Sequence, residues 1–127
     1  MMRMLERREN IIVIKTEAFA DRIVKMHKYL LKKNCCSREL LSQVLRSGTS
    51  IGANTAEGQF AQSKADFFTK MTIALKEANE TRFWLKRLYA GECLSEMEYE
   101  SILTDVEEII SLLVKITETT KERYNKK

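Results

Sequence analysis

Apolar residues recur at alternating intervals of three and four along most of this 127-residue chain, and this spacing restricts the possible folds more than any other feature. Such spacing places the apolar side chains along one side of an α-helix. The sequence contains no proline, so nothing in it forces a long helix to kink or stop. The most regular run lies in the middle of the chain and comprises Phe67, Met71, Ala74, Ala78, Thr81, Leu85 and Leu88.

The apolar runs predict four helices joined by short connections. Serine residues suited to capping a helix N-terminus precede the last three runs, at Ser37, Ser63 and Ser95. Short connections make consecutive helices antiparallel neighbours. We therefore predict an all-α fold, an up-down-up-down antiparallel four-helix bundle that forms a single domain over residues 1–127. The predicted helices span residues 17–34, 38–61, 64–91 and 96–124.

The first fifteen residues are predicted to lie outside the bundle helices. They begin as a basic tail and continue with Ile11-Ile-Val-Ile14, a run of β-branched residues. Branching at Cβ restricts side-chain rotamers in a helix and favours extended structure. We therefore predict that residues 1–15 form a tail and an extended segment, with Thr16 as the N-cap of the first helix.

Residues 46–59 hold three of the four glycines, although they lie inside a predicted helix. Gly48 and Gly52 are one helical turn apart, and each interior glycine costs about 1 kcal/mol relative to alanine. Close approach of a second helix would offset that cost. Ala74 and Ala78 are the small seam residues of the next helix, so we predict that the two pairs face each other.

Three polar residues of the same stretch are interpreted as structural. Arg46 is expected to form an ion pair with Glu80 or Glu77, because an antiparallel hairpin places these residues opposite each other. Asn54 is expected to form a hydrogen bond within the bundle or between subunits. Glu57 is expected to lie opposite the start of the next helix.

The sequence carries no pattern that indicates an enzyme or a metal protein. His27 is the only histidine, and the residue three positions before it is Val24, so a bundle di-iron site cannot be built. Neither a zinc-binding motif nor a phosphate-binding glycine loop is present. We predict a protein without enzymatic activity, with no cofactor and no metal.

The three cysteines, Cys35, Cys36 and Cys93, have no metal-binding spacing, and their odd number argues for reduced thiols. The chain also lacks an apolar run long enough for a signal peptide or a membrane span. We therefore expect a soluble cytoplasmic protein with no membrane partner.

Charge is distributed unevenly along the chain. Residues 1–38 carry a net charge of +6 and residues 62–91 carry +3, whereas residues 92–127 carry −4. A basic surface can bind nucleic-acid phosphates, although a charged stripe on a helix can also be only its solvated side. The candidate nucleic-acid-binding residues are Arg22, Lys25, Lys28, Lys32, Lys64, Arg82 and Lys86.

Aromatic residues beside the apolar seam suggest a second kind of surface. Trp84 flanks the seam of helix 64–91 instead of occupying it. It is interpreted either as a residue at the edge of the bundle or, with Phe83 or Phe68, as an anchor between subunits.

Three segments together resemble a known family. They are Leu45-Arg-Ser-Gly-Thr-Ser-Ile-Gly-Ala-Asn-Thr-Ala-Glu57, Ser63-Lys-Ala-Asp-Phe67 and Lys76-Glu-Ala-Asn-Glu-Thr-Arg-Phe-Trp-Leu85. These segments resemble bacterial four-helix bundle proteins encoded by intervening sequences within large-subunit ribosomal RNA genes. The resemblance covers nearly the whole chain and departs from the family pattern at residues 58–62.

The resemblance implies a four-helix bundle that assembles into a homopentamer. It also implies kinship with the accessory variability protein of diversity-generating retroelements, which works with a reverse transcriptase and nucleic acid. Two functional hypotheses follow. The first is a non-enzymatic oligomeric adaptor associated with RNA, DNA or a nucleic-acid enzyme such as a reverse transcriptase, contacting the nucleic-acid backbone with little sequence preference. The alternative is a protein-binding scaffold that binds no nucleic acid.

Overall fold

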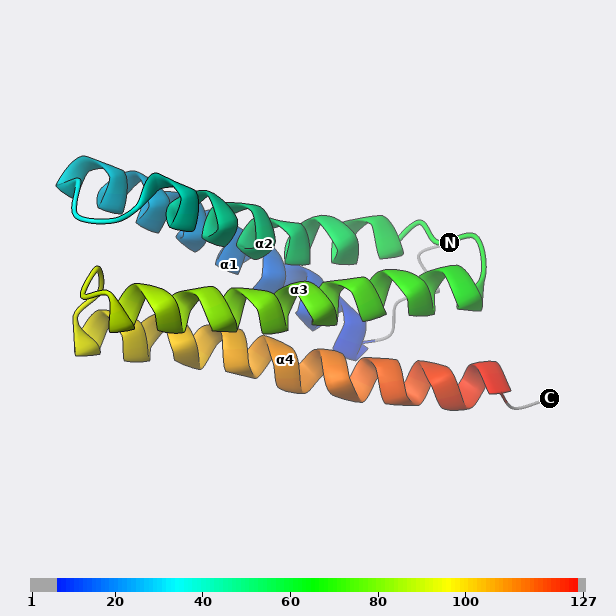
Figure 1. Ribbon diagram of the computed structural model, residues 1–127. Helices are drawn as coiled ribbons and strands as arrows, with labels where there is room; N and C mark the ends of the chain where they lie inside the picture. Colours follow the sequence, from blue (N-terminus) through cyan, green and yellow to red (C-terminus); the bar gives the residue numbers. More distant parts are fainter. Residues whose placement is uncertain (1–6, 126–127) are drawn as a thin grey trace.

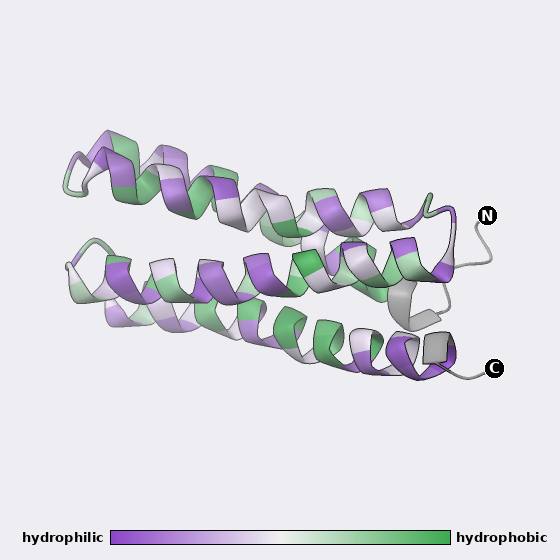
Figure 2. Cartoon of the chain, turned by 45° about the vertical axis from the view of Figure 1, so that its right-hand side comes forward, coloured by the Kyte–Doolittle hydropathy of each residue, from purple (hydrophilic) through white to green (hydrophobic). Residues whose placement is uncertain are grey.

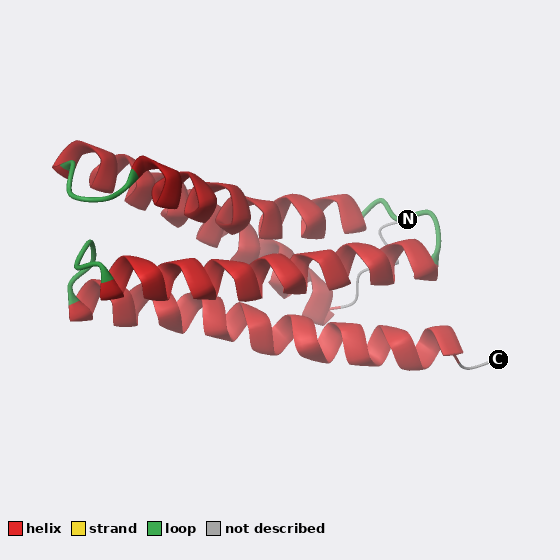
Figure 3. Ribbon diagram, in the orientation of Figure 1, coloured by secondary structure: helices red, strands yellow, loops and turns green. Residues whose placement is uncertain are grey.

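The computed structural model describes residues 7–125, and within this range every regular element is an α-helix (Figures 1 and 3). Each helix packs against its neighbours in the sequence, and α1 also packs against α4. The diagonal pairs, α1 with α3 and α2 with α4, make no close backbone contact. This arrangement confirms the predicted all-α four-helix bundle. The helices are α1 (Arg7–Lys33), α2 (Arg38–Gly58), α3 (Lys64–Ala90) and α4 (Glu96–Asn125).

Serine caps begin the last three helices, as the sequence predicts. The Ser37 hydroxyl accepts a hydrogen bond from the backbone N–H of Leu40, and the Ser63 hydroxyl accepts one from Asp66. At α4 the bonding is reciprocal, since Glu98 N–H donates to the Ser95 hydroxyl and Ser95 N–H donates to the Glu98 carboxylate. These bonds satisfy backbone donors that the first helical turn leaves unpaired.

The prediction of an extended segment before residue 16 is wrong for the described residues, because α1 begins at Arg7. The seam of α1 continues backwards from Phe19 through Thr16 to Ile12, at intervals of three and four, and all three residues are buried. Burial of an isoleucine contributes about 1.5–3 kcal/mol, more than the few tenths by which β-branching disfavours a helix. Thr16 is therefore not an N-cap but an interior residue, and residues 1–6 lie outside the described range.

The core consists of one apolar seam from each helix. The seam of α3 is buried from Phe67 to Leu88, and that of α4 is buried from Ile102 to Ile116. Polar and apolar residues alternate along each helix, as Figure 2 shows, so no helix is apolar throughout. Two hydroxyl pairs are buried in this core. Thr16 and Thr55 lie 2.7 Å apart, and Thr81 donates to Ser47 over 2.9 Å.

Gly48 and Gly52 face a different helix from the predicted one. A Cβ atom on Gly48 would lie 2.8 Å from Ile23 of α1, and one on Gly52 would lie 3.0 Å from the carbonyl oxygen of Thr16, also in α1. The predicted pairing of these glycines with Ala74 and Ala78 is therefore wrong, although all four residues lie in the interior or at its edge. The third glycine of the stretch, Gly58, ends α2 three residues earlier than predicted and faces Met71 of α3.

The structure also corrects the expectation of reduced thiols, because Cys36 and Cys93 form a disulfide with Cα atoms 5.8 Å apart. Cys36 lies between α1 and α2, and Cys93 lies between α3 and α4, so the two loops meet at the same end of the bundle (Figure 1). The pair is separated by 57 residues in the sequence, so only the antiparallel packing brings it together. Cys35 remains a free, exposed thiol.

Candidate nucleic-acid interface

Three lysines of α1 form an exposed basic stripe, which we call the α1 stripe: Lys25, Lys28 and Lys32. Their intervals of three and four place them on one side of the helix. Within the described part of the chain, no carboxylate lies within ion-pair distance of any of them. Their charges are therefore available to an outside anion, with exposed Asp21 marking the N-terminal limit of the stripe.

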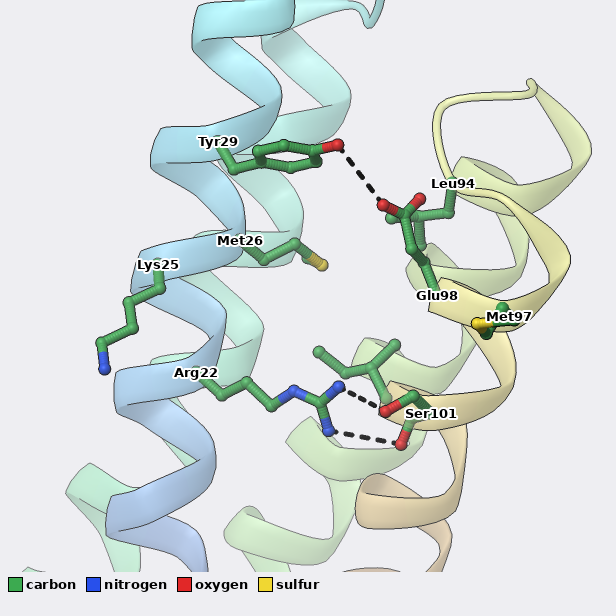
Figure 4. A pocket seen from close by; sticks show the side chains of 9 residues that line it. Arg22, Lys25, Met26, Tyr29, Leu94, Met97, Glu98 and Ser101 are labelled. Atoms are coloured by element: carbon green, nitrogen blue, oxygen red, sulfur yellow. Dashed lines mark hydrogen bonds between the residues drawn. The ribbon is translucent and has the colours of Figure 1, made fainter.

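Arg22, the fourth predicted contact of α1, is used within the bundle instead. Its guanidinium donates to the Asp105 carboxylate over 2.6 Å and to the Ser101 hydroxyl over 2.6 Å. Figure 4 shows this side chain reaching across to α4. Arg22 therefore ties α1 to α4, and its charge is largely neutralised by Asp105.

The predicted contacts of α3 lie on another side of the molecule. Lys64 and Lys86 are exposed, whereas Arg82 donates to the Asn79 side chain over 2.9 Å and lies 4.0 Å from the Glu107 carboxylate. Because α1 and α3 are diagonal in the bundle, the seven predicted cations do not form one patch within a single chain. They lie on two helices on opposite sides of the bundle, and Lys64, the first residue of α3, is at the other end of that helix from Arg82 and Lys86.

Phe83 is an exposed aromatic side chain on the outer side of α3, between the cations Arg82 and Lys86. Its ring is half exposed, and the Arg87 guanidinium lies over it, 4.5 Å from the ring centroid. Trp84 meets the same ring edge-on at 5.0 Å between centroids. The other two predicted interface aromatics, Trp84 and Phe68, are only partly exposed.

A groove of about 440 Å³ runs beside Phe83, between α3 and α4. The sequence alone did not reveal this groove, because it depends on side chains from two helices. The interval of four between Phe83 and Arg87 was the available signal for their contact. The groove is lined by Asn79, Arg82, Phe83, Lys86, Tyr99, Leu103 and Glu107.

A second groove, of about 430 Å³, opens between α1 and α4 next to the α1 stripe (Figure 4). Its surface is mostly apolar, and the Tyr29 hydroxyl donates to Glu98 over 3.4 Å across it. Met97 at its rim is 82% exposed. The sequence did not predict this groove, and Met97 gave no sign of a special role. The groove is lined by Arg22, Lys25, Met26, Tyr29, Leu94, Met97, Glu98, Ser101 and Ile102.

Arg46 forms both of the ion pairs that the sequence left open. Its guanidinium donates to Glu77 over 3.2 Å and also to Glu80. The Trp84 indole N–H donates to the same Glu80 carboxylate over 3.0 Å. The Trp84 bond and the Arg46 contact hold the pKa of Glu80 below its ordinary value, since both stabilise the charged form. This network joins α2 to α3 and leaves Arg46 no uncompensated charge.

The remaining polar residues of the glycine-containing stretch are also satisfied locally. The Asn54 amide donates to the Ser50 carbonyl oxygen over 2.9 Å, one turn earlier in α2. The Glu57 carboxylate accepts a bond from Lys70 of α3 over 2.8 Å. These contacts give both residues a structural role within this chain.

The described residues offer neither a metal-binding cluster nor a membrane-spanning helix. No group of three or more histidine, cysteine, aspartate or glutamate side chains in residues 11–123 could hold a metal ion. None of the described helices is both long enough and apolar enough to cross a membrane.

Comparison with known proteins places the chain in a family. The family model for the 23S rRNA-intervening sequence protein matches residues 8–115. A solved structure from the S23 ribosomal protein family of Bacteroides thetaiotaomicron, a protein of unknown function, is 46% identical, with a TM-score of 0.84, and covers 87% of this chain and 98% of its own. No curated protein matches the chain. The matched range includes residues 45–57, which carried the resemblance in the sequence, so the chain belongs to the family of 23S rRNA-intervening sequence proteins.

Proposed function

We propose that this protein is a non-enzymatic adaptor that associates with RNA or DNA, alone or together with a nucleic-acid enzyme such as a reverse transcriptase. The observation that carries the proposal is the α1 stripe, whose three lysines have no ion-pair partner among the described residues. Lysines left unpaired on one side of a helix can replace the counterions of a phosphate backbone. The family name, which refers to ribosomal RNA, agrees with a nucleic-acid partner.

The geometry of the α1 stripe suits contact with the phosphate backbone of a nucleic acid better than recognition of its bases. From Lys25 to Lys32 the helix rises by roughly 10 Å, so three flexible ammonium groups can follow consecutive phosphates. The stripe offers point charges and no planar donor–acceptor pair of the kind that reads a base edge. Binding is therefore expected to depend little on sequence.

Self-association would strengthen such binding. The family resemblance implies a ring of five copies, in which five α1 stripes would act on one polyanion. Linked sites raise the effective concentration for each further contact, so modest affinity per stripe becomes useful avidity. We therefore propose a homopentamer, and native mass spectrometry of the full chain tests it directly.

The test of nucleic-acid binding is a salt titration with a charge-matched control. The double variant Lys25→Glu/Lys28→Glu should weaken binding to RNA or DNA and flatten the dependence of log K on log salt by about 1 for each lost phosphate contact. The control Lys115→Glu/Lys121→Glu alters the net charge equally, at exposed positions of the acidic α4, and should have a smaller effect. If both variants weaken binding equally, the interaction depends only on the net charge of the protein, and the α1 stripe is not the binding site.

A protein-binding scaffold is the second candidate, and the apolar groove between α1 and α4 favours it. Exposed Met97 and half-exposed Tyr29 at its rim are side chains that protein interfaces commonly bury. If the wild-type protein binds neither RNA nor DNA in a mobility-shift titration at low salt, the scaffold hypothesis replaces the adaptor hypothesis.

A further inference from the structure

We infer that the outer side of α3 binds single-stranded nucleic acid by stacking an unpaired base on Phe83. The inference rests on the proposed function and adds to it a binding site and a substrate class. It concerns a surface diagonal to the α1 stripe, on the opposite side of the bundle.

The surroundings of Phe83 on α3 are mainly basic. Its helical neighbours at intervals of three, four and seven include Lys76, Lys86 and Arg87, together with neutral Asn79. The one carboxylate at such an interval is Glu80, three positions earlier, and it forms an ion pair with Arg46 of α2 and accepts a bond from the Trp84 indole. Within α3, an exposed aromatic ring thus has several cations beside it, and the one neighbouring carboxylate is already paired.

Phe83 is held in a fixed position by its neighbours. Trp84 contacts its edge, and the Arg87 guanidinium covers part of it at 4.5 Å from the centroid. The ring is still half exposed. A base can therefore stack on the exposed part of the ring or on the planar guanidinium, which are the two surfaces on which proteins commonly stack unpaired bases.

The groove between α3 and α4 extends this surface from one base to a short strand. Tyr99 and Leu103 of α4 provide apolar contact on one side, and Arg82 and Lys86 of α3 provide positive charge on the other. Glu107 lies 4.0 Å from Arg82 and excludes phosphates from the α4 side. A strand would therefore run with its phosphates along α3 and its bases toward the groove.

A single strand fits this surface better than a duplex. The bases of a duplex are stacked on each other, so their faces cannot reach Phe83 without unstacking. The cations alone would attract both forms, since each carries phosphates. Phe83 is thus the residue that distinguishes the stacking inference from simple charge attraction.

The experiment measures fluorescence anisotropy of labelled oligouridylate, oligothymidylate, an abasic strand of equal length and a duplex. Phe83→Ala should weaken binding of both single strands by about 5- to 150-fold, the range expected for loss of one base–aromatic stack. Phe83→Tyr keeps a ring and should restore most of the affinity. Phe60→Ala, which removes another exposed phenylalanine ring between α2 and α3, is the matched control and should change nothing.

The abasic strand separates stacking from charge. It retains the phosphates but has no bases, so Phe83→Ala should leave its binding unchanged. If Phe83→Ala weakens the abasic strand as much as oligouridylate, or weakens neither, the inference is overturned while the proposed function stands. If the wild-type protein binds none of the four probes, the proposed function fails as well. A preference between the uridylate and thymidylate strands would show whether RNA or DNA is favoured.

Discussion

At Gly48 the bundle leaves no room for a methyl group. A Cβ atom at this position would lie 2.8 and 2.9 Å from two atoms of Ile23, and both are close to the stiff branch point of a fully buried side chain. Ile23 cannot rotate away without losing its own packing. The glycine therefore sets the distance between α1 and α2. The fold requires glycine here because it has no side chain, and not because its backbone is flexible.

We predict that Gly48 and Ile23 are energetically coupled. Gly48→Ala should destabilise the protein by about 1–3 kcal/mol through overpacking. Ile23→Ala alone should cost about 2–5 kcal/mol, but less in the Gly48→Ala background, because the truncation removes the clash. A double-mutant cycle from denaturant unfolding should give a coupling of about 0.5–3 kcal/mol.

The same cycle with Leu85→Ala of α3 is the control for this coupling. Leu85 is fully buried but belongs to a helix that Gly48 does not face. The two changes should add within about 0.5 kcal/mol. Strong coupling to Leu85 and none to Ile23 would contradict the assignment of Gly48 to the α1 contact.

At the scale of one element, α1 shows tertiary burial overriding local preference. The β-branched residues 11–14 favour extended structure locally, yet Ile12 is fully buried while Ile14 is 67% exposed. In an extended segment these two residues would lie on the same side, because side chains there alternate. In a helix they lie about 200° apart, and only Ile12 falls on the seam with Thr16.

This difference makes the start of α1 testable with two matched variants. Ile12→Ala should cost about 2–5 kcal/mol of unfolding free energy, and Ile14→Ala should stay within about 0.5 kcal/mol of the wild type. Both changes remove the same atoms, so the comparison isolates burial. Similar losses from both variants, measured by chemical denaturation, would instead indicate the extended segment.

The sequence could predict features that depend on residues close together in the chain, but not features that depend on which helices pack together. The seam of α3 and the serine caps depend on residues within a few positions of each other, and these predictions were confirmed. The direction of Gly48 and the neutralisation of Arg22 by Asp105 depend on which helices become neighbours. For the same reason, net charge predicted where cations lie in the chain but not that α1 and α3 would hold them on opposite sides.

At the scale of the whole molecule, one end of the bundle is covalently closed. The Cys36–Cys93 disulfide joins the loop after α1 to the loop after α3, across 57 residues of sequence. Closing a loop of that length in the unfolded chain reduces its conformational entropy. The same end also contains the groove residue Leu94, directly after Cys93, so the bond lies next to the groove between α1 and α4.

We predict that reducing this disulfide lowers the free energy of unfolding by about 2–5 kcal/mol. Cys93→Ser should have a similar effect and make the protein insensitive to reductant, whereas Cys35→Ser should leave both properties unchanged, because Cys35 is exposed and free.

Alkylation followed by mass spectrometry counts the thiols directly. The native protein should react at Cys35, and all three cysteines should react after reduction and unfolding. Disulfides persist mainly in oxidising surroundings, so protein isolated under reducing conditions needs reoxidation before the measurement. A melting temperature unaffected by reductant in fully oxidised protein would show that the bond does not stabilise the fold.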